Sequence, residues 1–110
     1  MSNIKMMRSF MVATRARTIY NLAAQGSYLR ALKIINLTIF NLETANLPDM
    51  PNSTVQRCIM LLASAATYAN RRSKEPIMQY MDDLIDECEA ANDSLETLPH
   101  VVRSAIAFAF

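Results

Sequence analysis

The chain has 110 residues, a formal net charge of +1 and a hydrophobic fraction of 52%. So much apolar material excludes a disordered chain and is enough for the core of a single domain. The single glycine excludes glycine-rich loops that bind nucleotide phosphates, and it disfavours a β-rich fold with many turns. We therefore expect one all-α domain, whose net charge gives no preference for a nucleic-acid partner.

The first expected helix spans residues 3–25. Ser2 or Asn3 can cap its start, and Gly26 should end it, because glycine enters the left-handed conformation freely. No acid occurs in the first 42 residues, so this stretch also resembles a mitochondrial presequence, although its apolar pattern continues into the fold. The residues that set the helical spacing are Ile4, Met7, Met11, Ile19 and Leu22.

The second helix is expected over residues 27–45. Apolar residues occupy one broad face and, through Leu29, Leu37 and Phe40, other sides as well. A helix with this pattern is predicted to be buried on most sides. The β-branched segment 34–39 leaves a strand as the alternative, but helical spacing continues through it and favours a helix.

Residues 20–32 resemble the turn of a tetratricopeptide repeat. That family places a glycine near the end of its first helix, then an aromatic and a small residue early in its second, as Gly26, Tyr28 and Ala31 do here. The resemblance implies helical hairpins that bind proteins. It covers one hairpin, because Arg72 and Ser73 stand where the second hairpin would need glycine, and the family's period of about 34 residues is absent.

Two prolines mark residues 47–52 as a loop, and Ser53 is expected to cap a third helix over residues 54–70. Apolar residues cover every side of this helix, so we predict that it is the most buried one. The small residues of segment 63–66 would let a neighbouring helix approach closely.

A basic turn at residues 71–74 precedes a fourth helix, expected over residues 75–92 and ended by Asn92–Ser94. A last, apolar helix is expected over residues 98–109, with Pro99 in its first turn. The predicted fold is thus an all-α, single-domain bundle of four to five helices, built from two helical hairpins and a C-terminal apolar helix.

No arrangement of residues predicts catalysis, a metal or a cofactor. His100 is the one histidine, and a surface or capping role is its simplest explanation. Asp82 and Asp86 lie one turn apart, as metal ligands on helices do, but the other helices offer almost no matching acids. We expect Cys58 and Cys88, both on apolar helix faces, to be buried and reduced in a cytoplasmic protein.

The remaining surface residues carry the functional expectation. We expect a non-enzymatic protein that binds a protein partner, including a second copy of itself, through surplus apolar residues: Met6, Phe10, Met11, Phe108 and Phe110. Candidate basic-surface residues are Lys5, Arg8, Arg15, Arg17, Arg71, Arg72 and Lys74, and candidate acidic-face residues are Asp82, Asp83, Asp86, Glu87 and Glu89. The alternatives are a nucleic-acid-associated regulator that uses the basic helices and, less favoured, a carboxylate metal-dependent hydrolase. Pairing between the basic first helix and the acidic fourth helix would remove the basis for the nucleic-acid alternative. No segment is long and apolar enough for a membrane span.

Overall fold

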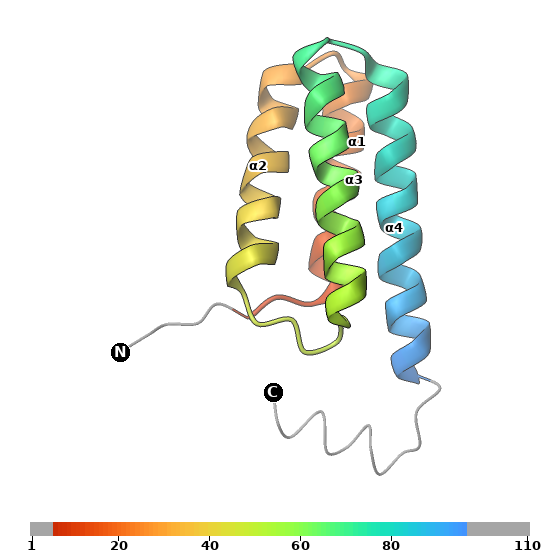
Figure 1. Ribbon diagram of the computed structural model, residues 1–110. Helices are drawn as coiled ribbons and strands as arrows, with labels where there is room; N and C mark the ends of the chain where they lie inside the picture. Colours follow the sequence, from red (N-terminus) through yellow and green to blue (C-terminus); the bar gives the residue numbers. More distant parts are fainter. Residues whose placement is uncertain (1–5, 97–110) are drawn as a thin grey trace.

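The computed structural model describes residues 6–96, and the surroundings of side chains through residue 92. This part forms four helices: α1 (Ser9–Ala24), α2 (Tyr28–Thr44), α3 (Asn52–Asn70) and α4 (Lys74–Glu96). Successive helices run in opposite directions, as Figure 1 shows, and α1 and α3 each pack against both α2 and α4. The helices α2 and α4 therefore occupy opposite corners of the bundle. The predicted all-α bundle is confirmed for this part of the chain.

The core lies along the common axis of the four helices. Alanines such as Ala16, Ala31 and Ala65 are fully buried and allow the helices to approach closely. Both cysteines are free and buried, as predicted. The largest side chains that are fully buried are Met7, Ile19, Ile35, Leu62, Ile77, Met81 and Leu84.

The predicted start of the first helix at residue 3 is wrong, because α1 begins at Ser9. The Met7 backbone N–H donates to the Asn46 carbonyl at 2.9 Å, so the chain before α1 is extended and lies against the α2–α3 loop. The carboxylate of Asp49 accepts hydrogen bonds from the Ser9 backbone N–H and from its hydroxyl, at 3.0 and 2.7 Å. The Asp49 carboxylate, which is distant in sequence, thus accepts hydrogen bonds at the start of α1, where a cap at Ser2 or Asn3 was predicted.

Other boundaries also differ from the prediction. Ser53 lies inside the first turn of α3, which begins one residue earlier at Asn52, and no side chain caps it. The predicted break at Asn92–Ser94 is wrong, because α4 continues through Glu96. Asparagine, aspartate and serine lower helix propensity only slightly and do not stop a helix by themselves. The expected helix at 98–109, with Pro99 and His100, lies outside the described residues.

Two tight turns close one end of the bundle with the same hydrogen bonds. After α1, Gly26 has a φ of 77°, and the Ser27 N–H donates to the Leu22 carbonyl at 2.8 Å. After α3, Arg72 has a φ of 55°, and the Ser73 N–H donates to the Tyr68 carbonyl at 3.0 Å. Both turns are Schellman motifs, and Arg72 therefore adopts the left-handed conformation that glycine usually provides at this position.

The prediction that the second helix is buried on most sides is wrong, and α3, predicted to be the most buried helix, also has an exposed face. Leu29, Leu37 and Phe40 on α2 are exposed, and so is Met60 on α3. Each helix packs mainly on two neighbours, so one face of it stays open to solvent. In the described region, no helix is both long enough and apolar enough to cross a bilayer.

Candidate interaction surfaces

The predicted apolar interface residues divide into three groups. Met6 and Phe10, at the start of α1, are exposed, Phe10 to 65%. Met11 is half-buried and packs against the core, so it belongs to the fold. Phe108 and Phe110 lie outside the described residues.

A larger apolar surface lies on α2, where the sequence indicated burial. Leu29, Leu37 and Phe40 are exposed to 68%, 46% and 60%. Positions 29, 33, 37 and 40 follow the spacing of three and four residues that places side chains on one side of a helix. We name the residues Leu29, Arg30, Lys33, Leu37 and Phe40 the α2 face. All of them are exposed, and the acid Glu43 lies beyond Phe40, so the positive charge is concentrated in the first two turns.

Several predicted basic-surface residues bind within the chain. The Arg15 guanidinium donates to Thr38 Oγ1 at 3.3 Å and to Asn41 Oδ1 at 3.4 Å, which directs it toward α2. Arg71 lies over the Tyr68 ring at 5.6 Å, and Lys74 Nζ donates to the Ala24 carbonyl at the end of α1. A cation there also stabilises the negative end of the helix dipole.

In the described residues, the basic α1 and the acidic α4 are neighbours, but no ion pair joins them. The two helices pack side by side, and Arg8, Arg17 and Glu89 line one cavity of about 320 Å³ between them. Within the described residues, none of these three forms an ion pair, since the ion pair found there joins Arg57 and Glu87. The charges are thus near one another but not directly paired. Lys5 lies outside the described residues.

A second basic region lies at the end of the bundle that carries the tight turns. Arg30 from the start of α2 and Arg72 from the α3–α4 turn line a shallow cavity of about 360 Å³ over Gly26. Both arginines are exposed. Two chain segments distant in sequence therefore place guanidinium groups on one small surface.

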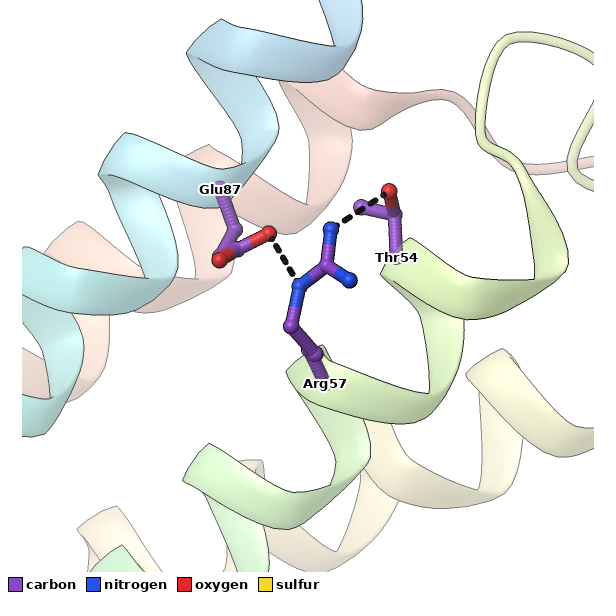
Figure 2. Close-up of polar contacts among 3 residues, drawn as sticks. All are labelled: Thr54, Arg57 and Glu87. Atoms are coloured by element: carbon purple, nitrogen blue, oxygen red, sulfur yellow. Dashed lines mark hydrogen bonds and ion pairs between the residues drawn. The ribbon is translucent and has the colours of Figure 1, made fainter.

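The acidic residues of α4 border a groove between α3 and α4. The groove has a volume of about 490 Å³, and Met60, Leu61 and Ser64 form its α3 wall. Arg57 and Glu87 also line this groove, and Figure 2 shows how Arg57 reaches from α3 to Glu87 on α4. Arg57 Nε donates to Glu87 at 2.9 Å, and Arg57 Nη2 donates to Thr54 Oγ1 at 3.3 Å. Asp83 and Asp86 complete the α4 wall.

These carboxylates differ in their surroundings. Asp82, Asp86 and Glu89 are exposed, whereas Asp83 is half-buried and accepts a hydrogen bond from Gln79 at 3.0 Å. Within residues 6–92, no group of three or more possible metal ligands comes together. Because Arg57 and Glu87 neutralise each other, Asp83 and Asp86 leave the groove with a local negative charge.

The two cysteines face each other across the α3–α4 contact. The interaction between the two thiols and their burial raise the pKa of the Cys88 thiol, whereas the same interaction lowers the pKa of the Cys58 thiol against the opposing effect of burial. Both thiols are buried in the core, so the pair contributes packing and neither sulfur is open to a reagent from solvent.

Sequence reasoning found the acidic groove residues and missed the α2 face. The sequence does contain a signal for this face, because α2 has more apolar residues than one buried side of a helix can hold.

Comparison with protein-family models, with curated proteins and with solved structures finds no match to this chain.

Proposed function

We propose that this protein is a non-enzymatic interaction module that docks onto a protein partner through the α2 face. The observation that carries the proposal is the exposure of Leu29, Leu37 and Phe40 on one side of one helix. A single exposed leucine needs no explanation, but large apolar side chains gathered on one face mark interaction sites. Phe40 is the natural anchor, since aromatic residues dominate the binding energy of interfaces.

The charges beside these residues indicate what kind of partner fits. Arg30 and Lys33 lie among the apolar side chains, and neither forms an ion pair within the described residues. An apolar partner surface with acids at its rim would satisfy both features. Opposite charge at a rim mainly increases the rate and specificity of association.

Photo-crosslinking tests the proposal. A photoreactive phenylalanine analogue at position 40 should yield discrete crosslinked protein adducts in cells that express the chain. The same analogue at position 18, exposed on α1 and outside both the α2 face and the α3–α4 groove, is the matched control and should yield few. Leu37→Asp should remove the adducts at position 40. Equal adducts at both positions, or none at position 40, would contradict the proposal.

A second candidate function rests on the basic surface at the turns. Arg30 and Arg72 share one cavity there, and paired guanidinium groups suit a nucleic-acid phosphate. A titration with duplex and single-stranded oligonucleotides, at about 50 mM and about 200 mM salt, tests it. Binding should weaken with salt, and the Arg30→Ala/Arg72→Ala variant should lose it while Arg17→Ala retains it. Absence of binding at the lower salt would reject this candidate.

A further inference from the structure

We propose that the partner of the α2 face is the α3–α4 groove of a second copy of this chain. The inference rests on the proposed function and names its partner. It is carried by two surfaces of one molecule that complement each other in shape, charge and polarity, and that the fold keeps apart.

The first surface is convex, apolar and basic. Leu37 and Phe40 lie three residues apart on the same side of α2, so their side chains form one continuous projection. Lys33 lies one turn before Leu37, and Arg30 lies in the turn before that. Phe40→Asp would remove the main apolar group of this surface and add a charge of the wrong sign.

The second surface is concave, apolar and acidic. The groove of about 490 Å³ falls within the range of about 300–1,000 Å³ that is typical of ligand sites. Met60 on its wall is 68% exposed and offers an adaptable apolar contact. Asp83 and Asp86 lie on the opposite wall and could meet the Lys33 ammonium and the Arg30 guanidinium of an incoming α2 face.

The fold prevents one molecule from joining its own two surfaces. The helices α2 and α4 occupy opposite corners of the bundle, and α3 lies between them in Figure 1. The α2 face points away from the core, so it cannot fold back onto a groove whose acidic wall is on α4. A second molecule must supply the complementary surface.

A contact between two different surfaces is heterologous. The α2 face and the groove lie on different sides of the bundle, so one partner cannot occupy both, and every dimer leaves one of each surface free. Further copies can then add, and the assembly grows into a ring or an open chain. Such growth distinguishes this contact from a symmetric dimer, in which one surface meets its own copy and assembly stops at two.

Sedimentation velocity on the full chain tests this inference. At about 50 mM salt the wild type should form species larger than a dimer as its concentration rises toward the order of 100 µM. About 500 mM salt should weaken the assembly, since the charges lie at exposed rims. A wild type that stays monomeric over this range, or that stops at a dimer, would overturn the inference.

Two variants sharpen the test by each disabling one surface. Phe40→Asp removes the projection, and Asp83→Lys/Asp86→Lys reverses the groove charge; each variant alone should bind itself at least about tenfold more weakly. An equimolar mixture of the two should form a one-to-one heterodimer and nothing larger, because each variant keeps the surface that the other lacks. If the mixture stays monomeric, the inference is wrong.

Matched controls separate surface effects from misfolding. Phe10→Asp places the same charge at an equally exposed phenylalanine on α1, and Asp82→Lys reverses an exposed α4 acid outside the groove lining. Both should assemble like the wild type, and loss of assembly in either would overturn the inference. If the wild type is monomeric while the analogue at position 40 still crosslinks to another protein, this inference fails and the proposed function stands.

Discussion

At one end of the bundle, two short turns join consecutive helices through hydrogen bonds between residues at most five positions apart. At the other end, the start of α1 is held by Asp49 and Asn46, which lie about 40 residues along the chain. The first end is closed mainly by local backbone geometry, to which the exposed Lys74–Ala24 hydrogen bond adds one long-range contact, and the second by buried long-range contacts. Substitutions at the second end should therefore change global stability more, because they loosen α1 and the α2–α3 loop together.

The largest effect should come from Met7→Ala. Met7 belongs to the extended segment before α1 and is fully buried, so truncation removes its apolar contacts and leaves a cavity. We expect a loss of about 2–5 kcal/mol in the free energy of unfolding, measured by urea denaturation followed by circular dichroism. Met60→Ala, at an exposed methionine, is the control and should change it by less than about 0.5 kcal/mol. Equal losses in the two variants would show that Met7 does not belong to the core.

Asp49→Ala should have the next largest effect. It leaves the buried Ser9 N–H and hydroxyl without their acceptor, which should lower the free energy of unfolding by about 2–3 kcal/mol. Asp49→Asn keeps one oxygen acceptor and should lose less. Hydrogen exchange should also show faster exchange in the first turn of α1, whereas Asp82→Asn leaves both measurements unchanged. If Asp49→Ala has the same free energy of unfolding as the wild type, Asp49 does not stabilise the start of α1.

The difference between the two ends explains how far the sequence could predict the fold. The turn at Gly26 was predictable, since a helix C-terminus and a glycine are adjacent in the chain and the motif is local. The start of α1 was not, because nothing near Ser9 in the sequence indicates that Asp49 will reach it from the α2–α3 loop.

The candidate surfaces also contain parts that the sequence could predict and parts that it could not. The acids of α4 could be assigned to one region from their spacing alone, but the α3 wall of the groove requires knowledge of which helices are neighbours. The α2 face was missed because hydrophobic residues on all sides of a helix indicate burial, unless the number of neighbouring helices is known. Arg15 was predicted to be a surface residue, but its guanidinium donates hydrogen bonds to Thr38 and Asn41 on α2.

At the locally closed end, Gly26→Ala should cost about 1 kcal/mol. Nothing lies within 4 Å of an added Cβ at Gly26, so the cost is the strain of a positive φ and not a clash. The midpoint of urea unfolding should fall, with an unchanged slope. Hydrogen exchange in the first turn of α1 should stay as in the wild type, in contrast to Asp49→Ala. A loss as large as that of Asp49→Ala would contradict the idea that this end is independent of long-range packing.

The smallest effect, and the one in the opposite direction, should come from Arg72→Gly. Arg72 holds the same left-handed position as Gly26, at a φ of 55°, although its side chain disfavours that conformation. Glycine removes this strain but adds freedom to the unfolded chain, so the net gain should be about 0.5–1 kcal/mol. The neighbouring Arg71→Gly, where the backbone is right-handed helical, is the matched control and should lose stability. A higher free energy of unfolding for Arg72→Gly, together with a lower one for Gly26→Ala, would establish that one backbone geometry governs both turns. A lower value for Arg72→Gly would mean that the Arg72 guanidinium, which shares a cavity with Arg30 over the Gly26 turn, stabilises this end more than the backbone strain destabilises it.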